Sequence, residues 1–311
     1  MSRRAAASLL CVSALAGLAL TAAAAGSGGA GGHGILFVRA APGAPNAPQG
    51  GNIYVWQPGG GAARRLTSGS DPRDMPRWSP DGTRIAFTMI PGWNGEGSCQ
   101  PCQFQTWVMD ADGGGQRQLT SDWIQDAFPS WSPDGRRIAF EHDSGQRLTQ
   151  LMAIPAGGGS EQLLGAGWGV PAWGPQGIAY GGPAGTRIVD PATGSGRLLV
   201  RTRSFLSTSW SPDGKELAGI TSTTGNPWKT WVSVYSSGGR LLDSFAPRGG
   251  RSQVCGVTWS PDGARLLLTL YDRRTVLAGW LRHLYLYESD PDGAHGRRLP
   301  VRPSTCYTSW R

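Results

Sequence analysis

The sequence predicts an all-β protein built from a repeated antiparallel unit, and three observations support this. The 311 residues include 48 glycines and 23 prolines, which leave few uninterrupted stretches for long helices. Charged residues make up only 16% of the chain, too few for a coiled coil, whereas 39% hydrophobic residues with 14 tryptophans suffice for a core. The third observation is a five-residue motif that recurs along the chain. A helical bundle and a wholly disordered chain are therefore excluded.

The motif is Trp-Ser-Pro-Asp-Gly, and each copy leads into an apolar stretch such as Ile85-Ala86-Phe87. Proline fixes φ, aspartate accepts backbone N–H bonds and glycine takes the left-handed position, so the motif predicts a turn between two antiparallel strands. We expect its aspartates to stabilise the fold. Four copies are identical, one is degenerate and the chain end truncates a sixth. The tryptophans are Trp78, Trp131, Trp210 and Trp259, then Trp173 (degenerate) and Trp310 (truncated), and the turn acids are Asp81, Asp134, Asp213 and Asp262.

Each motif unit continues into two further strands. A third alternating strand such as Thr106-Trp107-Val108-Met109-Asp110 follows, and a glycine-rich hairpin leads to a fourth. Four antiparallel strands in 40–50 residues are typical of a propeller blade. The sequence thus predicts a six-bladed β-propeller over residues 34–311, its last blade closed by N-terminal strands within 34–67 and a C-terminal strand at 305–311.

These repeats resemble the WD40-like repeats of TolB-type propellers. The resemblance rests on Trp-Ser-Pro-Asp-Gly, Ile-Ala-Phe, Val-Met-Asp-Ala-Asp-Gly and Gln-Leu-Thr of the first unit, and it covers residues 34–311. It implies the fold and not a function. Similar repeats also precede the catalytic domain of prolyl-oligopeptidase-type peptidases, but this sequence has no Gly-x-Ser-x-Gly motif for a nucleophile.

The N-terminal segment is typical of a secretory signal. Two arginines precede an uncharged run from Ala5 to Ala25, and the small residues Ala23 and Ala25 close it. We expect a signal peptide over 1–25 and a flexible linker over 26–33, with an uncleaved membrane anchor as the alternative. The protein is therefore expected to be exported to the periplasm, the cell envelope or the medium, without a membrane span after cleavage.

Four cysteines remain outside the signal segment, and an even number of cysteines in an oxidising compartment suggests disulfides. Cys99 and Cys102 can close a short disulfide loop. Cys255 and Cys306 each lie four residues before a repeat tryptophan, which places them at equivalent positions on neighbouring inner strands and predicts a second disulfide. A zinc site made of all four cysteines is the alternative.

The candidate binding residues are tryptophans and arginines of the loops on one face of the propeller. Such residues are frequent anchors of protein interfaces. They suggest an exported, non-catalytic scaffold that binds an envelope protein or peptide, or in second place a polysaccharide. The residues are Trp93, Trp123, Trp168, Trp228 and Trp280 with Arg273, Arg274 and Arg282.

An enzyme, a lyase or hydrolase at the channel mouth, is the rival class. The entrances of the inner strands offer only Asp74 and Asp126 as acids, beside aromatic residues such as Phe128 and Tyr307. The four histidines fall in different units, so no catalytic residue, metal site or cofactor is predicted. The net charge of +8 comes from scattered arginines without a long basic run, so nucleic acid is not an expected partner, and a monomer is expected.

Overall fold

The strands of this chain follow the motif spacing closely. The computed structural model describes residues 34–40, 50–92, 103–121, 125–143, 145, 149–201, 207–222, 229–247, 252–272 and 283–311. All 23 strands lie in these ranges, and the described residues contain no helix. Accordingly, no helix among them is long and apolar enough to cross a membrane.

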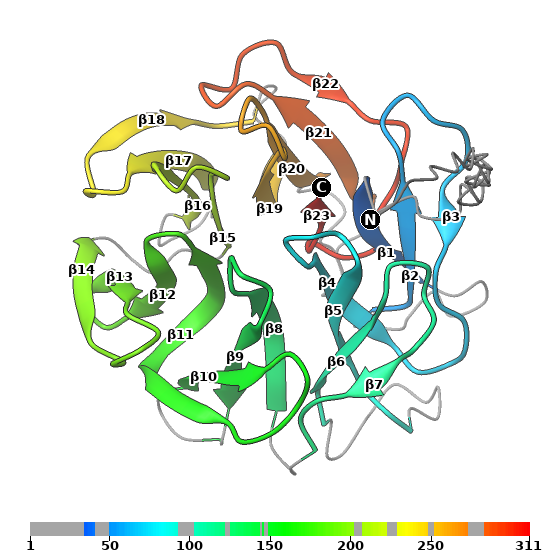
Figure 1. Cartoon of the computed structure of the whole chain (residues 1–311). Helices are drawn as coiled ribbons and strands as arrows, with labels where there is room; N and C mark the ends of the chain where they lie inside the picture. Colours follow the sequence, from blue (N-terminus) through cyan, green and yellow to red (C-terminus); the bar gives the residue numbers. More distant parts are fainter. Residues whose placement is uncertain are drawn as a thin grey trace, which may run out of the picture. The chain divides into compact units, whose positions relative to one another are not determined.

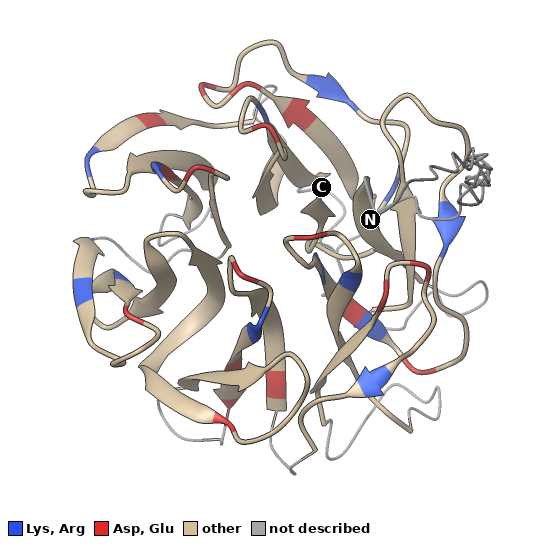
Figure 2. Cartoon of the chain, in the orientation of Figure 1, with Lys and Arg blue, Asp and Glu red and all other residues tan. Residues whose placement is uncertain are grey.

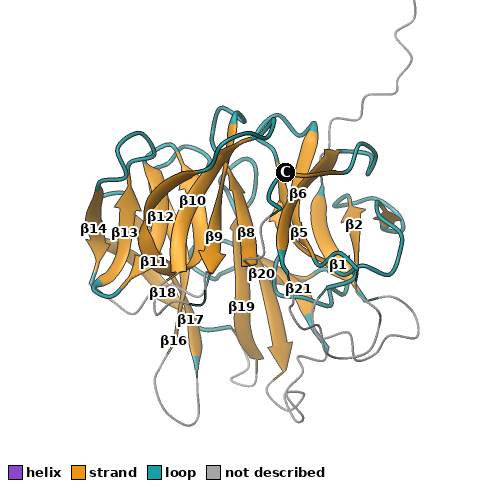
Figure 3. Cartoon of the chain, turned by 90° about the horizontal axis from the view of Figure 1, so that it is seen from below, coloured by secondary structure: helices purple, strands orange, loops and turns teal. Residues whose placement is uncertain are grey.

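The strands form four sheets of four strands and one sheet of seven, all antiparallel. Figure 1 shows these sheets arranged around a common centre, and Figure 3 shows the strands from the side. The prediction of an all-β propeller is confirmed. The closing sheet, which joins the two ends of the chain, contains β23 (Ser309–Trp310), β1 (Ile35–Arg39), β2 (Asn52–Trp56) and β3 (Arg64–Arg65).

The other sheets follow one another along the chain, and in each of them consecutive strands are neighbours. One sheet contains β4 (Arg73–Trp78), β5 (Arg84–Met89), β6 (Gln105–Asp110) and β7 (Arg117–Gln118). The seven-stranded sheet contains β8 (Gln125–Trp131), β9 (Arg137–Asp143), β10 (Thr149–Pro155), β11 (Gln162–Gly174), β12 (Gly177–Gly182), β13 (Gly185–Val189) and β14 (Gly196–Val200). The last two contain β15 (Thr208–Trp210), β16 (Glu216–Ser222), β17 (Thr230–Ser236) and β18 (Leu241–Phe245), and then β19 (Ser252–Trp259), β20 (Leu266–Asp272), β21 (Tyr285–Ser289) and β22 (Arg297–Arg298).

The four complete motifs form the same turn. In the first copy the Ser79 hydroxyl donates to Asp81 Oδ1 at 2.6 Å, and the Thr83 amide donates to the same oxygen at 3.0 Å. Gly82 has φ of +70°, a value that favours glycine. The other three copies repeat both bonds. The degenerate copy at Trp173 has Gly174 and Gln176 in place of the serine and the aspartate, and so has no such pair.

We expect Asp81→Ala to lower the free energy of unfolding by about 0.5–2 kcal/mol, as the loss of other side-chain caps does. The Ser79 hydroxyl and the Thr83 amide lower the pKa of Asp81 to about 2, because both bonds favour the charged carboxylate. Urea unfolding measures the change, and Gln176→Ala in the degenerate turn is the matched control, expected to have little effect. An Asp81→Ala protein that unfolds like the wild type would contradict the role of this carboxylate.

The repeat tryptophans join neighbouring sheets. The indole N–H of Trp131 in β8 donates to the carbonyl of Arg77 in β4 at 3.1 Å, and Trp259 in β19 does the same to Ser209 in β15. The apolar clusters also lie between sheets: Leu36 and Val38 of the closing sheet, for example, pack in one cluster with Phe87 of β5. Burial between sheets is therefore what holds the ring together.

The outer edges are mostly short and cationic. Strands β3, β7 and β22 have two residues each and contain one or two arginines, which appear blue in Figure 2. Short, charged edge strands discourage edge-to-edge pairing with other chains. Strand β18 differs, because its Leu241 is 51% exposed.

The C-terminal segment closes the ring over a shorter strand than the predicted 305–311. In β23, Trp310 pairs with Ile35 and Ser309 with Leu36. The next contact on β1 is the Val38 carbonyl, which accepts from the Ser304 amide at 2.7 Å. Between these contacts β1 has only Phe37, whereas the C-terminal segment has residues 305–308. The extra residues must leave the ladder, and that bulge carries Cys306.

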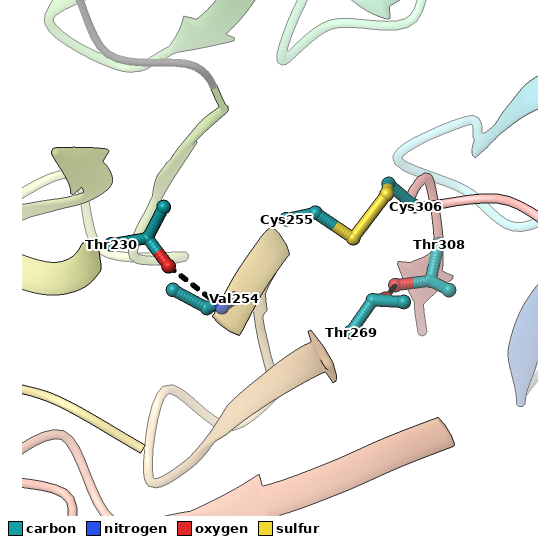
Figure 4. Close-up of a disulfide and its surroundings, with 6 residues drawn as sticks. All are labelled: Thr230, Val254, Cys255, Thr269, Cys306 and Thr308. Carbon is teal, nitrogen blue, oxygen red and sulfur yellow. Dashed lines mark hydrogen bonds between the residues drawn. A yellow bond between two sulfur atoms is a disulfide. The ribbon is translucent and has the colours of Figure 1, made fainter. Parts of the chain in front are cut away.

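The bulge is tied to β19 by the disulfide between Cys255 and Cys306, whose Cα atoms lie 5.4 Å apart (Figure 4). Cys255 also lies at a bulge, because Val254 pairs with Leu270 and Gly256 with Thr269. Both cysteines thus lie in irregular segments, where the sequence predicted regular inner strands. Cys99 and Cys102 lie outside the described residues.

Candidate functional site at the central channel

The centre of the ring contains a small cavity between inner strands. Its volume is about 130 Å³, and Arg77 of β4, Ser130 of β8, Trp173 of β11 and Trp210 of β15 contribute to its lining. Pockets that bind small molecules typically measure about 300–1,000 Å³, so this cavity is small by comparison.

Two inner strands bend where they approach this cavity. Met75 in β4 and Phe128 in β8 each lie three residues before their tryptophan, and both have positive φ, +56° and +59°. The register shifts there, between Asp74 and Arg77 and between Ala127 and Ser130. Such bulges redirect side chains, and positive φ costs a non-glycine residue free energy that its surroundings must offset.

The bulges bring two aromatic rings together. Phe128 of β8 and Tyr307 of the C-terminal bulge lie edge to face, with ring centroids 5.3 Å apart. The β4–β7 sheet separates their parent sheets in chain order, so the contact links sheets that do not share a hydrogen-bonded ladder. Phe128 precedes Ser130 along β8, so the rings lie on the side of the cavity where the inner strands begin.

A carboxylate and a guanidinium lie beside these rings. Asp74 Oδ1 accepts from the Met75 amide at 2.7 Å, and Arg77 donates to the Thr308 carbonyl. Burial raises the pKa of Asp74 to about 6, although the Met75 amide and the charge of Arg77 oppose the shift. Burial also lowers the pKa of Arg77, and burial together with the charge of Asp74 raises the pKa of Tyr307. The electrostatics here are those of a poorly hydrated site.

A second polar group lies between β8 and β9. Asp126, which is fully buried, places Oδ1 2.8 Å from Nδ1 of His142, its partner across the two strands. The Asp126 amide donates to the Phe104 carbonyl, and the Thr106 hydroxyl donates to the Asp126 carbonyl. The backbone of Asp126 therefore connects β8 to the neighbouring sheet, and its side chain connects β8 to β9.

The third group surrounds Glu141 of β9. Its Oε2 accepts from the Gly169 amide at 2.6 Å and from the Tyr180 hydroxyl at 3.4 Å, and Thr149 lies 2.9 Å from that hydroxyl. Burial raises the pKa of Glu141 above its ordinary value. These bonds connect β9, β10, β11 and β12.

Asp126 and Glu141 thus hydrogen-bond to other strands and help to hold them together, whereas Asp74 accepts from the amide of the next residue in its own strand. Within the described ranges, no three His, Cys, Asp or Glu side chains gather closely enough to hold a metal ion. The sequence placed Asp74, Asp126, Phe128 and Tyr307 at the channel entrance. The sequence also has one dense cluster of acids and a histidine, Glu141-His142-Asp143, which provides the Glu141 and His142 of these groups. The sequence did not identify Arg77 and Tyr180, whose partners lie across strands. The degenerate copy at Trp173 was its only sign of an irregularity near the cavity.

Most of the predicted loop-face residues lie outside the described residues. These are Trp93, Trp123, Trp228, Trp280, Arg273, Arg274 and Arg282. Trp168 is described, and it lies inside strand β11, where it pairs with Gly181, and not in the loop that the sequence predicted. The reason is that β11 runs without a break through two repeat units. The Trp168 side chain is 38% exposed and is available for contacts.

Comparison with known sequences gives short matches. No protein-family model matches the chain. A Tol-Pal system protein TolB from Anaeromyxobacter dehalogenans is 48% identical over 54 residues, which are 17% of this chain and 10% of that protein. An uncharacterized peptidase, YuxL of Bacillus subtilis, is 34% identical over 87 residues, 28% of this chain and 12% of that protein. The matches thus span only a small part of these relatives.

Comparison with solved structures covers more of the chain. TolB from Acinetobacter baumannii superimposes with a TM-score of 0.66 at 17% identity, over 89% of this chain and 66% of that one. An oligogalacturonate lyase in complex with manganese gives 0.51 at 14% identity, over 79% and 70%. Likeness at such identities shows the fold, which is TolB-like, and leaves the activity open.

Proposed function

We propose that this protein is an exported, non-catalytic propeller scaffold that binds an envelope protein or peptide through the loop face. The observation that carries the proposal is the channel itself: its cavity is small, at about 130 Å³, and Asp126 and Glu141 are each hydrogen-bonded to another strand. Recognition then falls to the surface loops, as in many folds with a rigid framework. The relatives named as Tol-Pal system proteins favour a location in the envelope. Residues 1–25 would serve as the signal peptide and 26–33 as a linker.

The scaffold would have six blades, with the seven-stranded sheet counted as two. Strand β11 is then both the fourth strand of one blade and the first strand of the next. Packing supports this division. Ala139 and Leu151 of β9 and β10 share an apolar cluster with Ile178 and Tyr180 of β12, as expected for the faces of two neighbouring blades.

The binding residues would be the tryptophans and arginines on the face that carries the loops between second and third strands and the links between blades. Tryptophan and arginine are the side chains that most often carry binding energy at interfaces. The exposure of Trp168, which lies where two repeat units meet, fits such a surface. We expect the protein to act as a monomer.

Capture of partners from envelope extract tests this proposal. We expect the full chain to retain a defined set of proteins, and Trp228→Ala and Trp280→Ala to weaken their retention by 2 kcal/mol or more, about thirtyfold in affinity. Leu241→Ala, which truncates an exposed side chain of the outer strand β18, is the control and should retain them. If both tryptophan variants captured every partner as the wild type does, the proposed face would be wrong; recovery of polysaccharide alone would also overturn the choice of partner.

An enzyme at the channel mouth is the alternative, favoured by the buried pair of Asp126 and His142 at 2.8 Å. A carboxylate that orients a histidine is a common part of general-base sites. The lyase among the similar structures suggests acidic polysaccharides as substrates to test. A screen of glycosidic, ester and peptide substrates with and without chelator decides between the two classes, because the scaffold predicts no turnover in either condition.

A further inference from the structure

We propose that a cavity at the closure of the ring binds an oxyanion, a carboxylate or phosphate group carried by a larger ligand. The cavity measures about 500 Å³ and lies where the end of β1, the residues before β21 and the segment after β22 meet. Its lining is Arg39, Ala40, His283, Leu284, Pro300, Arg302, Pro303 and Ser304. In Figure 1 the red C-terminal segment passes beside the blue β1 at this closure.

Arg39 is held in place before any ligand arrives. Its guanidinium carbon lies 5.1 Å from the ring centroid of Phe37 and 5.3 Å from that of Tyr54. Its Nε is 3.4 Å from the carbonyl of Arg302. An arginine packed over aromatic rings loses little side-chain entropy when it binds, and its terminal N–H groups match the two oxygens of a carboxylate or phosphate.

The cationic charge of the cavity is not neutralised by the part of the chain that the structure describes. The lining contains two arginines and a histidine and no carboxylate, and no ion pair involves Arg39 or Arg302 among the described residues. The contrast is Arg297 in the adjacent outer strand, which pairs with Glu288 at 2.9 Å. The sequences that lead away from Ala40 and into His283, residues 41–49 and 273–282, contain no Asp or Glu either.

A hydroxyl donor completes the site. The Ser304 hydroxyl oxygen accepts from the Ala40 amide at 2.9 Å, and the Ser304 amide donates to Val38 at 2.7 Å. The residue is thus fixed from both sides, while its hydroxyl hydrogen can point to a ligand. Two guanidinium groups and a hydroxyl are the donors that oxyanions prefer in proteins.

The volume leaves room for a ligand larger than a single anion, and the oxyanion would be one group of that ligand. Strand β1 ends at Arg39, which places the cavity on the face of the loops between second and third strands. The inference rests on the proposed function of that face and gives the partner a chemistry: it presents a carboxylate or a phosphate there.

Calorimetric titration of the full chain tests the site with citrate, inorganic phosphate and neutral glucose at low salt, where exposed charges are least screened. We expect citrate or phosphate to bind and glucose not to. Arg302→Gln and Arg39→Gln should each weaken binding by at least about tenfold. Arg65→Gln removes the same charge from the outer strand β3 of the same sheet and should leave binding unchanged. Arg302 is exposed, so its variant keeps the test valid even if Arg39→Gln fails to fold.

The outcomes separate the sources and the two proposals. Binding of citrate alone assigns a carboxylate ligand, and binding of phosphate alone a phosphorylated one. No binding of either anion, or equal weakening by Arg65→Gln, overturns the site. If anions do not bind but the envelope partners are still captured, the anion site is wrong and the proposed function stands. If anions bind and no partner is captured, the anion site stands and the proposed function is wrong.

Discussion

Replacement of both Cys255 and Cys306 by serine is expected to lower the free energy of unfolding by about 4 kcal/mol, the chain-entropy value for a loop of this length. The two cysteines are 51 residues apart in sequence, and the bond joins β19 to the segment that closes the ring. Without it, the C-terminal end is held to β1 by only two paired residues of β23 and a few adjacent bonds. Urea unfolding followed by tryptophan fluorescence measures the loss.

The two segments that the disulfide joins also touch through their backbones. Gly256 lies so close to the Cys306 carbonyl that there is no room for a Cβ on it, so the bulge and β19 are in direct contact. The Thr230 hydroxyl accepts from the Val254 amide at 2.8 Å and fastens β19 on its other side (Figure 4). The bond therefore reinforces a direct contact between β19 and the C-terminal bulge.

Cys99→Ser with Cys102→Ser is the matched control. That pair closes a much shorter loop, so its removal should cost less. Mass spectrometry of the non-reduced protein should find Cys255 linked to Cys306. Four free thiols with bound zinc, or equal stability of the Cys255/Cys306 variant and the wild type, would contradict this prediction.

The strands and turns of each unit could be predicted because their causes are local. Ser-Pro-Asp-Gly builds its turn from bonds within five residues, as in Ser79 to Thr83, so the motif predicts the flanking strands directly. The tryptophan spacing then predicts the number of units. The pairing of the first and last strands could also be predicted, because the first and last apolar stretches are incomplete units that complement each other.

The bulges could not be predicted, because they depend on how distant segments fit together. Nothing local distinguishes residues 305–308 from a strand; they leave the ladder because Ser304 bonds to Val38 while Ser309 pairs with Leu36. The same holds for Trp168, which was placed in a loop because the sequence does not show that β11 continues through two units.

Only part of the channel site could be predicted, because its remaining contacts also depend on how distant segments fit together. The position of Asp74 before its tryptophan placed it at the entrance of an inner strand. Its pKa, however, depends on burial by the C-terminal bulge and on Arg77, and the contact of Phe128 with Tyr307 depends on two bulges at once. The basic cavity at Arg39 was missed because its lining comes from both ends of the chain.

Asp74→Asn is expected to stabilise the protein at neutral pH and to have little effect at pH 4. Burial raises the pKa of Asp74 from its ordinary 3.8 to about 6. The neutral carboxyl is therefore favoured by the fold, and this contribution is fully present below pH 3.8 and is lost as the pH rises through 6. A shift of about two units corresponds to on the order of 3 kcal/mol, less the attraction to Arg77 that asparagine gives up. Thermal unfolding of both proteins between pH 4 and pH 7 measures the difference.

Asp81→Asn is the matched control, because its dependence on pH has the opposite sign. Hydrogen bonds from Ser79 and Thr83 hold the pKa of Asp81 at about 2, so its contribution is present above pH 3.8 and is lost as the pH falls toward 2. We therefore expect Asp81→Asn to be less stable than the wild type at pH 7, where Asp74→Asn is more stable. If Asp74→Asn differed from the wild type by the same amount at pH 4 and pH 7, the Asp74 carboxyl would titrate alike in the folded and unfolded chains. Its burial in the channel would then cost nothing.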